Sequence, residues 1–291
     1  MFRLLESLPA AQEQALDALR SRLAAYPAVV VAYSGGVDSA LVAAIAAEQL
    51  GERALAVTGV SPALAPHLRE EARLQAGWMG IRQQEIATAE LHDPAYSSNP
   101  AERCYACKRE LHGQLAALLA QLPHTAAQVL DGVNQDDLAD HRPGIRAARE
   151  RGVSSPLAEL GIDKQAVRQL SRALGFPWWD KPAQPCLASR FPYGEPISAA
   201  RLERVAAAED WLRQRGIAEL RVRSHGEAAR IELPADQLTR LLSDLQDGAL
   251  RAELVEAFQE LGFSAVSLDL EGLVSGKLNR ALRGQGEDPA A

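Results

Sequence analysis

The sequence predicts an α/β protein, with a parallel sheet covered by helices on both faces and a smaller α+β domain towards the C-terminal end. Through the first two thirds of the chain, short apolar runs rich in valine alternate with helical segments. Alternation of this kind is typical of a parallel sheet that is buried on both faces. A proline-rich stretch at residues 182–196 then interrupts the pattern, and the elements that follow have a different order.

The first part contains four predicted strands. They are expected at residues 29–33, 53–60, 81–87 and 127–134. Helices are expected at the N-terminus, at residues 39–50, 67–80 and 163–175, and around the leucines of residues 111–122. Ser39–Leu50 is apolar nearly all round, which predicts a buried helix, and Gly51 supplies its C-terminal stop.

A boundary near Arg190 divides the predicted domains into residues 1–190 and 191–291. The second domain should contain a helix from the N-cap Ser198 to Gly216, strands at 219–226, 229–234 and 264–270, and one helix through 238–262. The polar tail at residues 283–291 is expected to be disordered.

Composition limits the classes of function. The 291 residues carry a formal net charge of −7, which disfavours a basic surface for nucleic acid. No uncharged apolar run reaches the roughly 18 residues that a membrane span needs. The N-terminal segment carries charges throughout, so a signal peptide is not expected. We therefore predict a cytoplasmic protein without nucleic-acid or membrane partners.

The stretch VVVAYSGGVDS, Val29 to Ser39, joins a predicted strand to a predicted helix through two glycines and two hydroxyls. Glycines there let the backbone approach a ligand closely. The amides of the loop and of the first helical turn are donors without partners, and the helix dipole adds positive potential. The stretch predicts a phosphate site, although it is neither GxxxxGK[ST] nor GxGxxG.

The motif SGGVDS resembles the PP-loop of the ATP pyrophosphatases, which adenylate a substrate by attack on the α-phosphorus and release pyrophosphate. The resemblance assigns the ATP phosphates to Ser34, Gly35, Gly36, Val37 and Ser39. It implies that Asp38 supports the loop or a Mg²⁺ ion, since a hard cation is expected between phosphates and a carboxylate.

A second polar stretch, LDGVNQDDLADHRPG, follows the fourth predicted strand. Ligands collect at the carboxyl ends of strands in an open parallel sheet, so this stretch should lie at the same site. Gly132 is expected to pass close to the nucleotide. The acidic residues could hold Mg²⁺ or orient Arg142; they are Asp136, Asp137 and Asp140.

Three cysteines are present: Cys104, Cys107 and Cys186. An odd number in a cytosolic chain argues against a disulfide framework. Cys104 and Cys107 form a CxxC at the predicted entry of a helix, where the helix terminus and nearby cations should lower the thiol pKa. From spacing alone, a redox pair, a zinc half-site and cluster ligands all fit.

Five further motifs together resemble the ATP-dependent sulfur transferases of the LarE type. They are RCYACK, DGVNQDDLADHRPG, DKPAQPCLASRFPYG, LRVRSHGEAARIE and GFSAVSLDLEGLVSGKLN. With the PP-loop they extend from Val29 to Asn279. The resemblance implies adenylation of a carboxylate of pyridinium-3,5-biscarboxylic acid mononucleotide and its conversion to a thiocarboxylate. This reaction serves the nickel-pincer nucleotide cofactor of lactate racemase. A homo-oligomer is also implied.

The resemblance implies two routes for sulfur. In the first, Cys104, Cys107 and Cys186 hold a [4Fe-4S] cluster, and its fourth iron carries a transferable sulfide from a sulfur donor. Clusters usually take four thiolates, so three cysteines leave one iron open, and we favour this route. In the second, Cys186 attacks the acyl-adenylate and gives up its own sulfur, which consumes the enzyme.

An anionic mononucleotide needs local positive charge on an acidic chain. Arg221 and Arg223 lie two residues apart in a predicted strand and should point the same way. Guanidinium groups suit phosphate, and the resemblance assigns this pair to the substrate phosphate. Ser189 and Arg190 are expected near the acyl-adenylate, and Glu209 is expected to orient an arginine.

The competing enzyme is a PP-loop tRNA thiolase, a class that also adenylates its substrate and includes members with a three-cysteine cluster. It would need a basic RNA-binding face, which the net charge of −7 disfavours.

Overall fold

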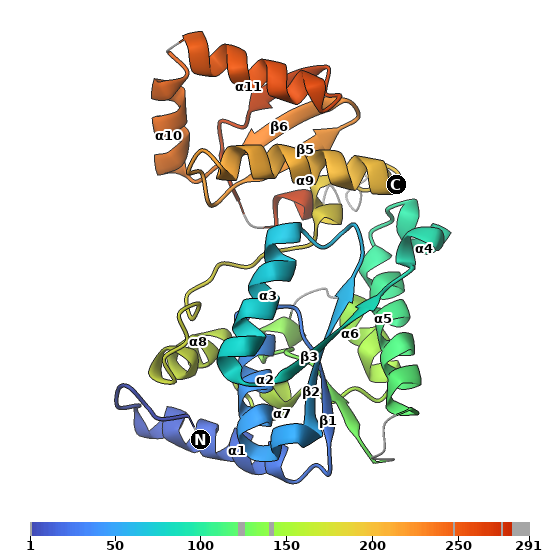
Figure 1. Cartoon of the computed structure of the whole chain (residues 1–291), viewed down its shortest axis with the longest axis vertical. Helices are drawn as coiled ribbons and strands as arrows, with labels where there is room; N and C mark the ends of the chain where they lie inside the picture. Colours follow the sequence, from blue (N-terminus) through green and yellow to red (C-terminus); the bar gives the residue numbers. More distant parts are fainter. Residues whose placement is uncertain (1, 122–125, 140–142, 247, 275, 281–291) are drawn as a thin grey trace, which may run out of the picture. The chain divides into compact units, whose positions relative to one another are not determined.

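The computed structural model describes residues 2–121, 126–139, 143–246, 248–274 and 276–280 (Figure 1). The chain forms two compact units: Met1–Tyr96 with Glu102–Gln184, and Ser97–Ala101 with Pro185–Ala291. The predicted disordered tail lies outside the described residues.

A four-stranded parallel sheet forms the centre of the first unit. Its strands are β1 (Val29–Ala32), β2 (Ala54–Val60), β3 (Arg82–Ala87) and β4 (Gln128–Leu130), in the order β3-β2-β1-β4. Val30 of β1 is in register with Leu55 on one side and with Val129 on the other. The predicted α/β fold with a parallel sheet is confirmed.

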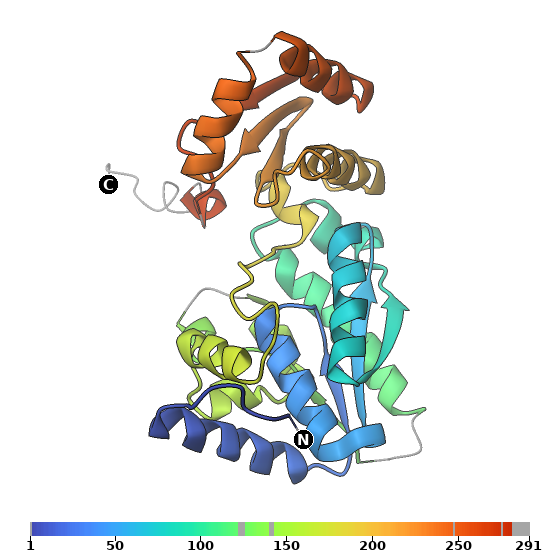
Figure 2. The ribbon, with the colours of Figure 1, turned by 60° about the vertical axis from the view of Figure 1, so that its left-hand side comes forward.

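Alternate residues of β1 enter two apolar cores, one on each face of the sheet (Figure 1, Figure 2). Val29 and Val31 pack with the helices on one face, and Val30 and Ala32 pack on the other. The first group of helices is α1 (Ala10–Ala24), α2 (Val37–Leu50), α3 (Pro66–Met79) and α8 (Lys164–Ala173). The second group is α5 (Arg103–Leu119) and α6 (Pro143–Glu150). The sequence of a strand that is buried on both faces is a continuous apolar run, and VVVA is such a run.

Short elements connect these helices and strands. The α-helical pieces are α4 (Pro94–Ser97) and α7 (Pro156–Glu159), and the 3-10 pieces are η1 (Gly51–Arg53), η2 (Glu90–His92) and η3 (Asp136–Leu138). No helix within the described ranges is both long enough and apolar enough to cross a membrane.

The second unit is built on a mixed three-stranded sheet. It contains η4 (Leu187–Arg190), α9 (Ala199–Arg213), β5 (Arg221–His225), β6 (Ala228–Glu232), α10 (Ala235–Asp244), α11 (Gly248–Glu260), β7 (Ala265–Leu268) and η5 (Lys277–Asn279). Strand β6 pairs antiparallel with β5 and parallel with β7. The predicted α+β organisation of this part is confirmed.

The expected single helix at 238–262 is wrong. Two helices, α10 and α11, occupy this stretch, and α10 begins three residues earlier, at Ala235. The second helix begins at Gly248, and glycine is among the weakest helix formers. Leucines continue on both sides of the break, so the apolar pattern alone does not reveal it.

Candidate active site

The PP-loop connects the carboxyl end of β1 to α2, as predicted. Gly35 has φ 72°, in the left-handed region that favours glycine, and a Cβ there would lie 3.1 Å from the Cβ of Ala72. Gly36 is the N-cap of α2 and has no side chain to cap the helix. The first intrahelical bond runs from the Ala40 amide to the Gly36 carbonyl. The earlier amides of the first turn therefore face the loop as donors for an anion.

The two serines close the loop on itself. Their Oγ atoms lie 3.2 Å apart, and Ser39 Oγ accepts the Ser34 amide at 3.3 Å and donates to the Gly36 carbonyl at 3.1 Å. Ser39 is buried, whereas Ser34 is exposed. The loop is thus held in shape without a ligand, and Ser34 presents its hydroxyl at the surface.

Both oxygens of Asp38 have hydrogen-bond donors. Lys164 Nζ lies 2.5 Å from Oδ2, and Asn134 Nδ2 donates to Oδ1 at 3.2 Å. Asp38 therefore ties the start of α2 to the start of α8 and to the turn after β4. Its role for Mg²⁺ remains a prediction.

Gly132 lies against the first turn of α2. A Cβ at Gly132 would stand 2.5 Å from the Ser39 nitrogen and 2.9 Å from the Asp38 carbonyl carbon. Only glycine allows this approach. The contact with a nucleotide that the sequence suggested for Gly132 stays a prediction, while its packing on the PP-loop helix is observed.

The acidic residues after Gly132 organise a turn. Asn134 Oδ1 accepts the amides of Asp136 and Asp137, at 3.0 and 3.2 Å. Asp137 Oδ2 accepts the Asn134 amide, and Asp136 Oδ2 accepts the Lys164 amide. These contacts favour a role in backbone positioning. Asp140 and Arg142 lie outside the described residues.

Two lysines that hold the PP-loop were missed by the sequence analysis. Lys164 reaches Asp38 across 126 positions of sequence, and Lys181 Nζ lies 3.4 Å from the Gly35 carbonyl. Lys181 also forms an ion pair with Glu71 of α3. No local pattern marks these lysines, because their partners are far away in the sequence.

Cys104 and Cys107 lie one turn apart at the start of α5, in the first unit. Cys104 is exposed and Cys107 is half-buried, and all three cysteines are thiols rather than disulfides. Arg109 is one of the cations near these thiols in the sequence, and its side chain pairs with Asp93 at 2.6 Å. Within the described ranges, no group of three or more His, Cys, Asp or Glu side chains is arranged to hold a metal ion.

Cys186 belongs to the second unit, where it is exposed and caps η4. The buried Arg190 holds this segment. Its Nη1 donates to the Pro185 carbonyl at 3.0 Å and to Ser189 Oγ at 2.9 Å. Its Nε and Nη2 donate to Glu209, at 2.7 and 3.1 Å. One guanidinium therefore holds Pro185, directly before Cys186, and Ser189, three residues after it.

Glu209 is fully buried and accepts four hydrogen bonds. Two come from Arg190, one from Arg213 and one from the Val222 amide at 3.0 Å. Burial alone would raise the pKa of Glu209, but the charge of Arg190 and its hydrogen bonds, helped by Arg213, outweigh burial and lower the pKa. Glu209 thus holds Arg190 in place, and its role at a substrate site stays a prediction.

The guanidinium of Arg223 also forms hydrogen bonds within the protein. Its Nε donates to Glu232 at 2.9 Å, and its Nη1 donates to the Ser189 carbonyl. Arg221 is different: no hydrogen bond or ion pair to another described residue involves its side chain. Burial lowers the pKa of Arg221, and the neighbouring charges of Arg223 and Arg190 act in the same direction. The predicted substrate residues thus all lie in the second unit. Among them, Arg221 is the arginine without an ion-pair partner in the described part of the chain.

Comparison with known proteins agrees with this geometry. The asparagine synthase family model matches residues 11–95, from α1 through β3 and including the PP-loop. The parallel sheet, the loop and this match define a PP-loop ATP pyrophosphatase-family enzyme.

Three relatives cover nearly all of the chain. An uncharacterized protein of Synechocystis is 53% identical over 93% of this chain and 98% of its own length. The pyridinium-3,5-bisthiocarboxylic acid mononucleotide synthase of Lactiplantibacillus plantarum is 35% identical over 87% and 90%. An uncharacterized protein of Methanocaldococcus jannaschii is 28% identical over 84% and 89%. The chain belongs to the LarE family of PP-loop enzymes, which contains that synthase.

Proposed function

We propose that the protein adenylates a carboxylate of pyridinium-3,5-biscarboxylic acid mononucleotide and converts it to a thiocarboxylate. The observation that carries the proposal is the group formed by Arg190, Glu209 and Arg221 in the unit that contains Cys186, in a chain 35% identical to the synthase from L. plantarum. The substrate class follows from the name of that relative and from the uncompensated guanidinium of Arg221.

Activation needs the PP-loop. A carboxylate oxygen of the substrate attacks the α-phosphorus of ATP, the bond from that phosphorus to the bridging oxygen breaks, and pyrophosphate leaves. The amides at the start of α2 and the hydroxyl of Ser34 are placed to donate to the leaving pyrophosphate. Donors fixed before the reaction stabilise the developing charge without reorganising. Mg²⁺ would neutralise the phosphates, with Asp38 as its nearest carboxylate in the loop.

The three arginines of the second unit have different proposed roles. Arg221 has no protein counter-ion among the described residues, so a substrate phosphate would relieve its repulsion from Arg223 and Arg190. Arg190 and Arg223 are saturated by Glu209, Glu232 and the η4 backbone. We therefore assign phosphate binding to Arg221 and positioning of the Cys186 segment to the other two arginines.

Sulfur then replaces the adenylate. A sulfur nucleophile forms a bond to the acyl carbon, the bond from carbon to the phosphate oxygen breaks, and AMP leaves. The three thiols suit a [4Fe-4S] cluster as donors, because two are accessible at the first turn of α5 and the third is exposed. When bound by Cys104, Cys107 and Cys186, such a cluster would leave one iron open for an added sulfide from an external donor.

The sacrificial route remains the alternative. There the Cys186 thiolate forms a thioester with the acyl group. Removal of the Cys186 α-proton and cleavage of its Cβ–S bond then leave dehydroalanine and the thiocarboxylate. The exposed position of Cys186 and its fixed flanking residues suit this reaction as well. The homo-oligomer implied by the sequence resemblance belongs to the same proposal.

The test is pyrophosphate release by the full chain with MgATP. We expect release that depends on pyridinium-3,5-biscarboxylic acid mononucleotide and rises with its concentration, and a thiocarboxylate product by mass spectrometry when sulfide is supplied. A Ser39→Ala variant should release pyrophosphate at least about tenfold more slowly, because it loses the hydroxyl that closes the loop. Release that is equal with and without the mononucleotide would contradict the proposal.

A further inference from the structure

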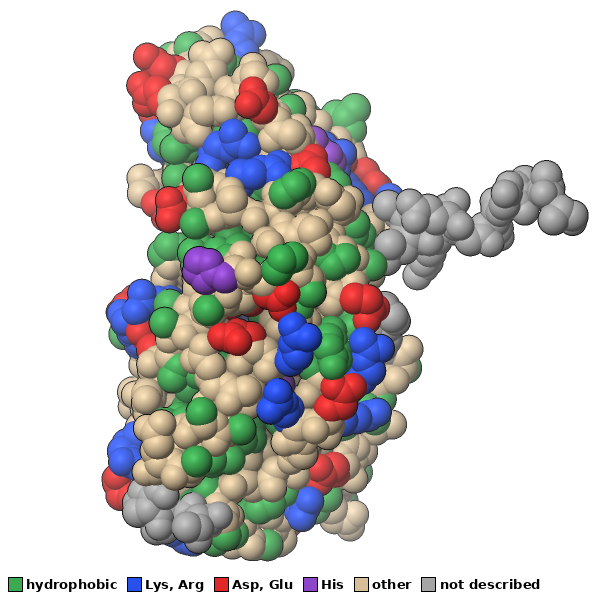
Figure 3. All heavy atoms as spheres, turned by 90° about the vertical axis from the view of Figure 1, so that its right-hand side faces the viewer, with side chains coloured by type: hydrophobic (Ala, Val, Ile, Leu, Met, Phe, Trp, Pro, Cys, Tyr) green, Lys and Arg blue, Asp and Glu red, His purple; other side chains and the backbone are tan. Residues whose placement is uncertain are grey.

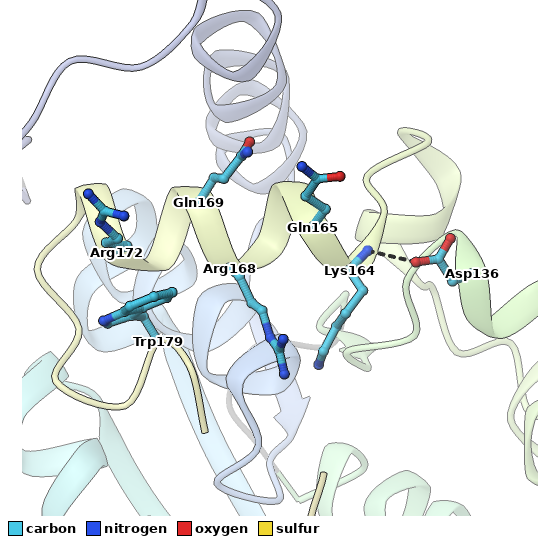
Figure 4. Close-up of a pocket in the computed structure, with 7 residues that line it drawn as sticks. All are labelled: Asp136, Lys164, Gln165, Arg168, Gln169, Arg172 and Trp179. Atoms are coloured by element: carbon cyan, nitrogen blue, oxygen red, sulfur yellow. Dashed lines mark hydrogen bonds between the residues drawn. The ribbon is translucent and has the colours of Figure 1, made fainter. Parts of the chain in front are cut away.

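A pocket of about 470 Å³ lies in the first unit, along helix α8 (Figure 4). It is lined by Asp136, Lys164, Gln165, Arg168, Gln169, Arg172 and Trp179. Three of the seven lining side chains are cationic, and only one is a carboxylate. They recur every fourth residue of α8, which places them near one another on the helix surface.

Two of the three cations already have counter-ions. Lys164 pairs with Asp38 at 2.5 Å, and Arg172 pairs with Glu6 at 2.8 Å and lies over the ring of Trp179. Arg168 differs, because none of the described residues forms a hydrogen bond or an ion pair with its guanidinium. Its Nε is buried and unsatisfied. Buried donors in folded proteins nearly always have an acceptor, so this atom is available to an anion in the pocket.

The direction of Arg168 connects the pocket to the PP-loop. Arg168 and Lys164 extend from α8 to the same side, whereas Gln165 and Gln169 extend to the other (Figure 4). Lys164 ends on Asp38, at the start of α2. An anion held by Arg168 would therefore lie beside the loop that carries the donors for ATP phosphates. A guanidinium fork suits two phosphate oxygens at once.

We propose that this pocket binds inorganic pyrophosphate, with Arg168 as its principal cation. The inference rests on the proposed function in one respect, since adenylation produces this anion next to the pocket. The one carboxylate of the lining, Asp136, disfavours large anions that would fill the whole pocket, so a short condensed phosphate suits it better. The pocket would then receive the leaving group after the α-phosphorus is attacked.

The test is calorimetric titration of the full chain with inorganic pyrophosphate, without ATP or pyridinium substrate. Loss of one charge-assisted fork should weaken pyrophosphate binding about 10- to 100-fold in Arg168→Gln. Arg149→Gln on α6 removes the same charge from an exposed site that does not line the pocket, so its affinity should stay within about twofold. Sulfate should bind at least about tenfold more weakly than pyrophosphate to the wild-type chain.

Three results would overturn the proposal. They are unchanged pyrophosphate affinity in Arg168→Gln, equal affinity for sulfate and pyrophosphate, and loss of affinity in Ser39→Ala without loss in Arg168→Gln. The last result would place the anion on the PP-loop alone. If Arg168→Gln does not fold, modification of the wild-type chain by phenylglyoxal replaces it. Pyrophosphate should then protect Arg168 and leave Arg149 reactive, and equal modification of Arg168 with and without pyrophosphate would refute the site.

The pyridinium substrate takes no part in this titration, so the two proposals fail separately. Normal substrate-dependent pyrophosphate release with unchanged affinity in Arg168→Gln refutes the pocket only. Absence of substrate-dependent release refutes the proposed function, while a weakened Arg168→Gln would still establish the anion site.

Discussion

Arg221 and Arg223 stand two residues apart on β5, yet their surroundings differ. Arg223 is 6% exposed and pairs with the fully buried Glu232. Burial and the charges of Arg223 and Arg190 lower the pKa of Arg221, and the opposing effects of Glu232 and Glu209 are smaller. The strand pattern predicts that both point the same way, and it gives no sign of which one is already neutralised.

We expect Arg221→Gln to raise the KM for the mononucleotide about 10- to 100-fold, because one charge-assisted bond to phosphate is lost. Its free energy of unfolding should stay the same or rise slightly, since a repelled cation is removed. Steady-state kinetics and urea unfolding measure the two effects.

Arg223→Gln is the matched variant. It leaves Glu232 buried with only the more distant Arg230 and Lys277, at 3.6 and 3.7 Å. We expect a loss of about 2–3 kcal/mol of stability, below the full cost of orphaning a buried charge. If Arg221→Gln destabilised the protein more than Arg223→Gln, the assignment of roles would be wrong.

A second residue-scale prediction concerns pH. Hydrogen bonds from Arg69 and Arg73 lower the pKa of Glu85 on β3 to about 2. A carboxylate with a depressed pKa contributes stability above its unfolded pKa, near 4.5, and this contribution is lost as the pH falls towards 2. Because these side chains are partly exposed, we expect Glu85→Gln to cost only about 1 kcal/mol at pH 7.

The stability difference between wild type and Glu85→Gln should shrink between pH 4.5 and pH 2. Thermal unfolding followed by circular dichroism at several pH values measures it, with the exposed Glu13→Gln as control. A difference that stays constant to pH 2 would disprove the pairing.

At the scale of elements, the contact between the end of β4 and the first turn of α2 shapes the site. The Cα of Gly132 lies so close to Ser39 that no side chain fits. We expect Gly132→Ala to destabilise the protein by about 2 kcal/mol or more, because backbone cannot yield as a flexible side chain does. ATP binding should weaken as well, since the turn would push on the PP-loop.

Gly113→Ala is the control for Gly132→Ala. Gly113 lies inside α5, and a Cβ there would meet nothing within 4 Å. This variant should gain about 1 kcal/mol from helix propensity. Both free energies come from urea unfolding, and a neutral Gly132→Ala would contradict the close approach.

Local patterns account for much of the fold. The run VVVA and the Ser-Gly-Gly that follows Tyr33 predicted β1, the PP-loop and α2. Burial on both faces requires consecutive apolar residues, and a tight turn requires glycine, so both can be recognised from adjacent positions. Contacts between distant positions produce no local sequence pattern. Lys164 with Asp38 and Lys181 with Glu71 were therefore missed, and so was the break before Gly248, where apolar periodicity continues across a change of element.

At the scale of the whole molecule, the proposed ATP residues belong to the first unit and the proposed substrate residues to the second. On the face shown in Figure 3, basic and acidic side chains are interspersed.

The three cysteines belong to both units, so a prediction about them concerns the whole molecule. If the cluster route operates, anaerobically purified protein should contain about four irons per chain, as expected for one [4Fe-4S] cluster. Cys104→Ala should then lose both iron and repeated turnover. Iron analysis and product yield per chain measure this. A Cys104→Ala variant that still transfers one sulfur, with loss only in Cys186→Ala, would support the sacrificial route.

The central claim is that a substrate carboxylate attacks the α-phosphorus of ATP. The most direct measurement uses substrate labelled with ¹⁸O in its carboxylates, followed by mass spectrometry of the nucleotide product. Attack by the carboxylate should put one ¹⁸O in each AMP formed, because the carboxylate oxygen leaves with the phosphate when sulfur takes its place. AMP without label, or label in the pyrophosphate, would contradict it.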